Sequence, residues 1–294
     1  MSARRPARAD RFCAPAPRPK PCRTGILFPP VRACARGKPA RALTARTFPL
    51  CAGLTALLYL LCSFHEMQLF PPTMAGADNA VSAAYLFGAV DNFNSLLDVL
   101  PVVAALCCAT SFCSDWRERY VHAILVRTTE GRYCACRLAA CFFVTALAVF
   151  LGVCLYLAAL AAFYPLTEES GGYLTWAYAD LVLGEQPVRY LLCKATVKAV
   201  FGGMWSIVAL ACSAIVPDML ITVASPLFLA RVESALGNLL HVPDALRLGY
   251  LSDSMIELGS WQASLLHACG LFLLYAALAG AAYRLLVKRR LRHG

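Results

Sequence analysis

The chain has 294 residues, of which 60% are hydrophobic and only 15% are charged, and its mean hydropathy is +0.61. These values lie outside the usual range of soluble domains and argue against an ordinary soluble globular protein. The formal net charge of +10 comes from residues 1–50, which hold twelve of the 27 basic residues and one of the 17 acidic residues. The sequence therefore combines an apolar body with a basic arm.

Residues 1–46 are predicted to form a basic cytoplasmic arm rich in Pro and Arg, with stretches such as "APAPRPKP". This composition cannot bury enough apolar surface to offset the entropy of ordering, so we expect disorder. A solvated arm or contact with anionic lipid is favoured over a nucleic-acid tail, and no nucleic-acid partner is expected. Because the polar stretch is too long for a signal peptide, the first apolar segment is expected to be retained.

Six segments are long and apolar enough to cross a bilayer, which requires about 20 residues of helix. They are residues 47–64, 93–113, 138–163, 195–216, 219–240 and 259–283. The fifth is the weakest because Arg231 and Glu233 fall inside it. The sequence thus predicts an all-α multi-pass membrane protein, with a six-helix domain at residues 47–288 and a basic cytoplasmic tail at residues 289–294.

The charges of the loops predict the orientation, because cytoplasmic loops carry an excess of Lys and Arg. The arm and the tail are both basic, so both ends are expected in the cytoplasm, which requires an even number of spans. Residues 114–137 contain five Arg and are also expected inside, as is the turn at Pro217. The acidic segments are expected outside. These are residues 65–92, 168–186 and 241–257.

Lys194 and Lys198 lie one helical turn apart at the expected outer start of the fourth span. The favoured interpretation is that their apolar stems follow the helix while the ammonium groups snorkel to the outer headgroups. The alternative is a cationic patch at the mouth of a substrate path. Asp98, expected at the outer end of the second span, is the third candidate residue for such a path.

Residues 114–137 interrupt the apolar chain with eight charged side chains. Asp115 is suited to cap a helix, and Glu118 three residues later fits the reciprocal capping pattern. Gly131 can adopt the left-handed conformation that ends helices. A short helix from Asp115 to about Val126 is therefore predicted.

Trp116, Tyr120 and Ile124 recur every four residues and would form one apolar face of this helix. Such a helix could lie on the membrane surface or fit a cleft on a soluble partner. The pattern alone leaves both interpretations open.

The same region resembles the signature between the second and third spans of type-2 ATP-binding-cassette (ABC) transporter permeases. The matching positions are Phe112, Asp115, Ile124, Leu125, Arg127, Tyr133 and Arg137. Residues 201–228 are similar to the fourth and fifth spans of that family, and the resemblance covers about residues 42–288. Glu118 and Arg119 depart from the family pattern, where Gly is common, and Arg137 replaces the usual Lys.

The resemblance implies that the loop carries a coupling helix that docks onto a separate ABC ATPase subunit, which binds ATP and Mg. The implied docking residues are Asp115, Trp116, Tyr120, Ile124, Leu125, Arg127, Tyr133 and Arg137. It also implies a second permease chain. The expected location is a bacterial cell membrane, and the expected role is export of a drug, peptide or lipid-like substrate. The sequence contains no GxxxxGK[ST] loop, so we expect no cofactor on this chain and no enzymatic activity of its own.

Two other classes stay open: an intramembrane enzyme, and a non-transporting scaffold or immunity protein. The enzyme would need ionisable groups that face one another in the bilayer, and the candidates are Asp98, Arg231, Glu233 and His267. There is no HExxH or GxSxG motif, and Arg231 and Glu233 do not share a helical face. His267 is interpreted as a hydrogen-bonded interhelical residue.

Cysteine is abundant, with 15 residues, but most occur singly within apolar runs, where Cys behaves as a small hydrophobic residue. Cys113, Cys134 and Cys136 could be grouped as a metal cluster. No CxxC spacing supports that interpretation, and a metal site is not expected.

Overall fold

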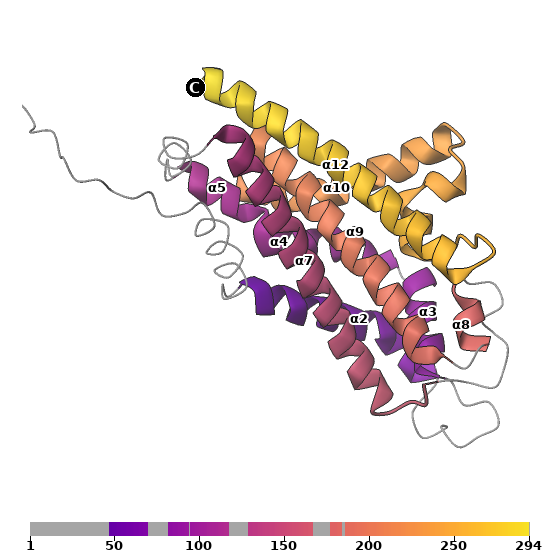
Figure 1. Cartoon of the computed structure of the whole chain (residues 1–294). Coiled ribbons are helices and arrows are strands. Elements are labelled where there is room, and N and C mark those ends of the chain that lie inside the picture. Colours follow the sequence, from indigo (N-terminus) through magenta and orange to yellow (C-terminus); the bar gives the residue numbers. More distant parts are fainter. Residues whose placement is uncertain are drawn as a thin grey trace, which may run out of the picture.

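The computed structural model describes residues 47–69, 82–93, 95–117, 129–166, 177–183 and 186–293, and every regular element within these ranges is a helix. The elements are α2 (Thr47–Leu69), α3 (Ala83–Phe93), η2 (Ser95–Val99), α4 (Leu100–Cys108), α5 (Thr110–Arg117), α7 (Glu130–Ala161), α8 (Ala179–Leu183), α9 (Pro187–Ile215), α10 (Met219–Leu239), η3 (Asp244–Leu246), α11 (Leu248–Ser252) and α12 (Trp261–His293). The predicted arm at residues 1–46 lies outside the described residues. Figure 1 shows the long helices packed side by side as a bundle.

Five helices are long and apolar enough to cross a membrane: α2, α7, α9, α10 and α12. They correspond to five of the six predicted spans, including the weakest one, α10. Two of them begin earlier than predicted, α7 at Glu130 and α9 at Pro187, and α12 continues to His293 through the expected tail. This fold is that expected of a polytopic helical membrane protein.

The second predicted span is not one continuous helix. Its apolar residues are divided among η2, α4 and α5, and the preceding residues form α3. Residues 83–92 and 96–108 meet the criterion for a span only as a pair, bent by 71°. The expectation that residues 65–92 are only an external loop is therefore wrong for its described C-terminal part, because Ala83, Leu86 and Phe87 are buried in the bundle.

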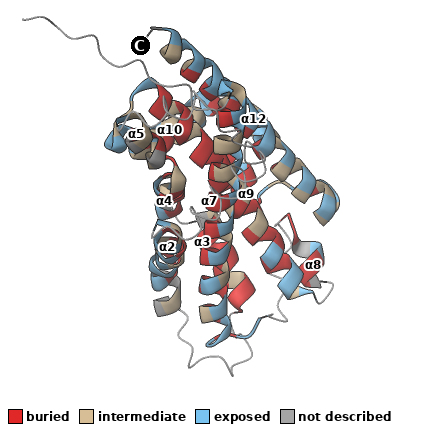
Figure 2. Cartoon of the chain, turned by 60° about the vertical axis from the view of Figure 1, so that its left-hand side comes forward, coloured by how far each residue is buried: buried red, intermediate tan, exposed pale blue. Residues whose placement is uncertain are grey.

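Helix α9 forms the centre of the bundle. In its most apolar membrane-length window 78% of the residues are buried, against 11% in α10 and 22% in α12. Figure 2 shows buried residues along α9 and on the helix faces turned toward it, with exposed residues on the outward faces. The outward faces carry large apolar side chains, as surfaces that contact lipid do. Examples are Leu57, Phe64, Phe143, Leu155, Phe228, Leu266, Leu278 and Leu285.

Small residues allow the helices to approach closely. A Cβ atom added to Gly152 of α7 would lie 2.6 Å from both the Ala52 carbonyl oxygen and the Thr55 Cβ of α2. A Cβ atom added to Gly203 of α9 would lie 2.9 Å from the Phe142 ring of α7. Because apolar side chains gain little by leaving lipid for a helix interface, such close packing is a main source of stability between membrane helices.

Local sequence defines both ends of α10. The Asp218 carboxylate accepts hydrogen bonds from the backbone N–H groups of Leu220 and Ile221, at 2.9 and 3.2 Å, and so caps the N-terminus. At the other end His241 has φ of 50°, and the Val242 N–H donates to the Gly237 carbonyl at 3.0 Å. This is the Schellman arrangement that satisfies terminal carbonyl groups.

Contacts between the described helix ends mark two ends of the bundle. At one end α5 packs against α12, since the Phe112 and Tyr283 rings lie 5.7 Å apart. At the other end the Ala83 N–H donates to the Pro165 carbonyl at 2.8 Å, and the Ala177 N–H donates to the Ser254 carbonyl at 3.2 Å. The described parts of the three segments with acidic loops therefore lie together, away from the end of α5.

Candidate functional site

A cluster of three charged side chains lies inside the bundle where α3 crosses α9. The Asp91 carboxylate lies 3.1 Å from the Lys194 ammonium and 2.7 Å from the Lys198 ammonium. All three residues are at least 97% buried. Since an unpaired charge is costly in such surroundings, the pairing explains how two Lys are tolerated on the most buried helix.

A fourth charge extends this cluster toward the surface. Asp253, at the C-terminal end of α11, lies 3.2 Å from the Lys198 ammonium and accepts a hydrogen bond from the Ser252 hydroxyl at 2.8 Å. Its side chain is 35% exposed. Burial raises the pKa of Asp253, and the Lys198 charge lowers it in part. Lys198 is thus shared between a buried carboxylate and a more accessible one.

The surroundings of Lys194 are aromatic. Its ammonium group lies 5.6 Å from the Phe87 ring centre and 5.8 Å from that of Tyr190, distances typical of cation–π contacts. The snorkelling interpretation is therefore wrong for both Lys194 and Lys198, because the ammonium groups point into the bundle and not to its surface. The physical reason is Asp91, whose carboxylate lies within ion-pair distance of both ammonium groups inside the bundle.

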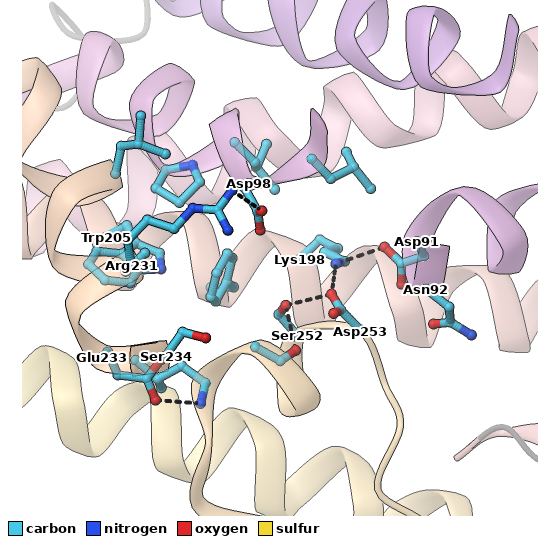
Figure 3. Close-up of a pocket in the computed structure, with 18 residues that line it drawn as sticks. Asp91, Asn92, Asp98, Lys198, Trp205, Arg231, Glu233, Ser234, Ser252 and Asp253 are labelled. Carbon is cyan, nitrogen blue, oxygen red and sulfur yellow. Dashed lines mark hydrogen bonds and ion pairs between the residues drawn. The ribbon is translucent and has the colours of Figure 1, made fainter. Parts of the chain in front are cut away.

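A cavity of about 300 Å³ opens beside this cluster, between η2, α4, α9, α10 and α11. Asp98 and Arg231 form an ion pair at 2.6 Å on its edge, where both side chains are substantially exposed. Figure 3 shows Asp91, Lys198 and Asp253 toward one end of the cavity, and Trp205, Arg231 and Glu233 toward the other. Of the three predicted path residues, Asp98 and Lys198 line this cavity, and Lys194 lies behind Asp91.

The other ionisable candidates have structural partners. Arg231 pairs with Asp98, and Glu233 accepts a hydrogen bond from the Leu248 N–H at 3.2 Å, so these two residues do not form a pair with each other. The His267 ring nitrogen Nε2 lies 2.8 Å from the Ala245 carbonyl oxygen, which agrees with the interpretation of a hydrogen-bonded residue. Within the described part of the chain, no group of three His, Cys, Asp or Glu side chains is arranged to hold a metal.

The two ends of the 114–137 insertion are joined by an ion pair. Arg137 of α7 donates to the Asp115 carboxylate of α5 at 2.5 Å. The predicted capping role of Asp115 is wrong, because α5 begins at Thr110 and Asp115 lies in its last turn. Gly131 likewise does not end a helix but lies in the first turn of α7.

Aromatic residues complete this anchor. Trp116 stacks against Phe112 with ring centres 5.9 Å apart, and the Arg290 guanidinium lies 4.8 Å from the Trp116 ring centre. Tyr133 is buried in the same cluster. Tyr133 and Arg137 therefore hold the ends of the insertion against the bundle. The remaining implied docking residues, Tyr120, Ile124, Leu125 and Arg127, lie outside the described residues.

Asp91 is the functional candidate that the sequence analysis missed, because its segment was assigned to a loop. A signal was present: Ala83, Leu86, Phe87 and Val90 follow the i, i+3, i+4, i+7 spacing of a buried helix face, and all four are buried. The helix they form carries Asp91 into the bundle.

Comparison with known proteins adds no relative: no family model, no curated protein and no solved structure matches the chain. The fold and the site by themselves define a chain whose described residues are all-helical, with membrane-length apolar helices and a charged cavity beside the central helix.

Proposed function

We propose that this chain is the membrane-spanning permease subunit of an ABC transporter and that a separate ATPase drives it. In this proposal the chain crosses a bacterial cell membrane six times, through the five long helices and the bent pair of α3 and α4, which comes second in the chain. Both ends of the chain lie in the cytoplasm. A second permease chain completes the transporter. The substrate passes beside α9 and leaves the cell.

The observation that carries the proposal is the anchoring of the 114–137 insertion. Its ends are tied together by Asp115 and Arg137 and tied to the C-terminal half of α12 by Trp116 and Arg290. A force applied to the residues between these ends would therefore be passed to α5 and α7. A lever of this kind is what coupling to an ATPase requires.

The helices that hold the insertion also connect it to the cavity. Helix α5 follows α4 after a single intervening residue, Ala109, and α4 contributes Leu100 and Pro101 to the cavity wall. Helix α7 packs along α9 through Gly202 and Gly203. Movement of the insertion would therefore shift two of the helices that surround α9, and the bend between α3 and α4 provides a place for that change.

The grouping of segments at the two ends of the bundle supports the proposed orientation. The end that holds the insertion also holds the basic end of α12 and the turn before α10, where the Cys113 thiol lies 3.3 Å from the Thr222 hydroxyl. If this end faces the cytoplasm, both basic segments, the insertion and the end of α12, lie on the side where an excess of Lys and Arg is expected. The cavity and its acidic residues then lie in the outer half.

The test is isolation of the chain from its native membrane in a mild detergent, with identification of the co-purifying proteins by mass spectrometry. We expect an ATPase with a phosphate-binding loop in the complex. The Tyr120→Asp/Ile124→Asp double variant should lose it, while Thr129→Asp, an exposed change at the start of α7, should retain it. Recovery of as much ATPase with the double variant as with Thr129→Asp and the wild-type chain would refute docking at this insertion.

A further inference from the structure

We infer that the cavity beside α9 binds a small organic cation that also carries a hydrogen-bond acceptor. This deepens the proposed function by naming a substrate class, and it depends on that function only for the transport of the cation. The inference rests on three observations: the balance of charge in the cavity, one buried donor that has no acceptor among the described residues, and the aromatic wall.

The cavity has an excess of negative charge. Asp91, Asp98, Glu233 and Asp253 line it, against two basic residues, Lys198 and Arg231. Lys194, which lies behind Asp91, brings a third positive charge, so the site as a whole keeps one more carboxylate than it has cations. In surroundings of low dielectric constant such an excess favours a monovalent cation over a neutral or anionic molecule.

Asp253 is the residue to which a ligand cation has access. It shares Lys198 with Asp91, but it is the more distant partner at 3.2 Å against 2.7 Å, and its side chain is partly exposed while that of Asp91 is fully buried. A ligand ammonium group can therefore join Asp253 while Lys198 keeps its contact with Asp91. The buried pairs stay compensated, which avoids the cost of leaving a charge alone.

Trp205 supplies the second recognition element. Its side chain is 97% buried and lines the cavity, and its indole N–H has no hydrogen-bond acceptor among the described residues. A buried donor left without an acceptor costs about 1–3 kcal/mol, so such groups are normally satisfied by a protein group, water or a ligand. An ether or carbonyl oxygen on the ligand would accept this hydrogen bond.

The remaining wall is suited to an aromatic ligand body. Phe201 packs edge-on against Trp205 with ring centres 6.1 Å apart, and Leu97, Leu100 and Leu227 add apolar surface. The volume is at the small end of the range for small-molecule sites. A benzyl-sized cation fits this description, with its ring against the aromatic pair and its ammonium group toward Asp253.

Four probes of one skeleton separate the recognition elements: 4-methoxybenzylammonium as the cation, 4-methoxybenzoate as the anion, 4-methoxybenzamide as the neutral form, and 4-ethylbenzylammonium as the cation without the ether oxygen. Binding to the purified full-length chain in mild detergent is measured by isothermal titration calorimetry, without any ATPase. We expect saturable binding of the methoxy cation at least about tenfold tighter than that of the anion and the amide. Equal binding of the three, or no binding of the cation, would overturn the inference.

Variants locate the site. Asp253→Asn should weaken binding of the methoxy cation by about tenfold, and Asp98→Asn, at a more exposed position, provides a second carboxylate change if the first variant fails to fold. Trp205→Phe should remove the preference, expected to be roughly threefold, for the methoxy over the ethyl cation. The matched controls outside the cavity are Asp244→Asn and Trp261→Phe. Unchanged affinities in all three cavity variants would contradict the assignment, and because no ATPase is present, this result is independent of the docking test.

Discussion

The Lys198 ammonium group lies 2.7 Å from the Asp91 carboxylate, deep between α3 and α9, and both side chains are almost completely removed from solvent. Asp91 also lies 3.1 Å from the Lys194 ammonium group, so this carboxylate is shared by two buried cations. This arrangement ties a helix of the bent pair to the central helix of the bundle. It makes Asp91 the residue on which the charged interior depends most.

Asp91→Asn should destabilise the bundle strongly, because the buried ammonium groups of Lys194 and Lys198 lose the charged carboxylate that they share. Removal of one member of a buried ion pair costs about 3–5 kcal/mol. The measurement is the thermal unfolding midpoint in mild detergent. Combining Asp91→Asn with Lys194→Met should recover part of the loss, since one uncompensated charge is removed with its partner. Asp244→Asn, an exposed carboxylate change, is the control, and an Asp91→Asn protein as stable as this control would contradict the assigned pairing.

Gly152→Ala should also lower stability, because the new methyl group would meet the Ala52 carbonyl oxygen and Thr55 at 2.6 Å. Backbone shifts that relieve such overpacking cost about 1–3 kcal/mol. Gly270→Ala in α12 is the matched control, since a Cβ atom there meets nothing within 4 Å. A lower unfolding midpoint is expected for the first variant alone. Equal midpoints would show that α2 and α7 are not packed this closely.

The anchor of the insertion can be tested by exchanging its charges. Asp115→Arg and Arg137→Asp should each lower the unfolding midpoint, because each places like charges together in a half-buried site. The double exchange should restore most of the loss, and the coupling between the two positions is expected at about 1–3 kcal/mol. Additive effects without any recovery would exclude a direct pair. Arg247→Asp, which disturbs an unrelated ion pair at the other end of the bundle, is the control for the recovery, since combining it with Asp115→Arg should restore nothing.

Binding of the methoxy cation should weaken as the pH falls through the range in which Asp253 takes up a proton. Burial raises the pKa of Asp253, so this carboxylate takes up a proton, and loses its charge, at a higher pH than an ordinary Asp. Of the charged groups around it, Lys198 from α9 opposes the shift, Asp91 from α3 adds to it, and Lys194 from α9 also interacts with Asp253. The benzylammonium probe stays protonated over this range. The pH dependence of the affinity should flatten in Asp253→Asn, and an unchanged dependence in this variant would place the responsible group elsewhere.

The apolar runs of the sequence predicted five of the long helices, because a membrane-length apolar segment has few alternatives to a helix. The positions at which these helices begin and end were predicted less accurately. The test for apolar runs stops at charged residues, such as Arg137 and Lys194, whereas the helices continue past them to Glu130 and Pro187. The bent pair was missed for a related reason: its two halves are each shorter than a span.

Only part of the charged cluster could be predicted from the sequence: the two Lys were noticed, but Asp91 was not. Two Lys one turn apart on an apolar helix require an explanation, but their partner lies more than a hundred residues earlier, and no local pattern connects Asp91 to Lys194. The pairing of Asp115 with Arg137 has the same character, since both residues were singled out as part of a family signature and not as contacts. Long-range pairing of this kind depends on how the helices pack, which hydropathy does not specify.

Whether a separate ATPase acts on this chain through the 114–137 insertion can be decided by measuring ATP hydrolysis in complexes isolated through this chain. We expect ATPase activity with the wild-type chain and with Thr129→Asp, and its loss with the Tyr120→Asp/Ile124→Asp double variant. Isolation of the intact wild-type chain from its native membrane without any ATP-hydrolysing partner, or equal activity in all three preparations, would contradict it.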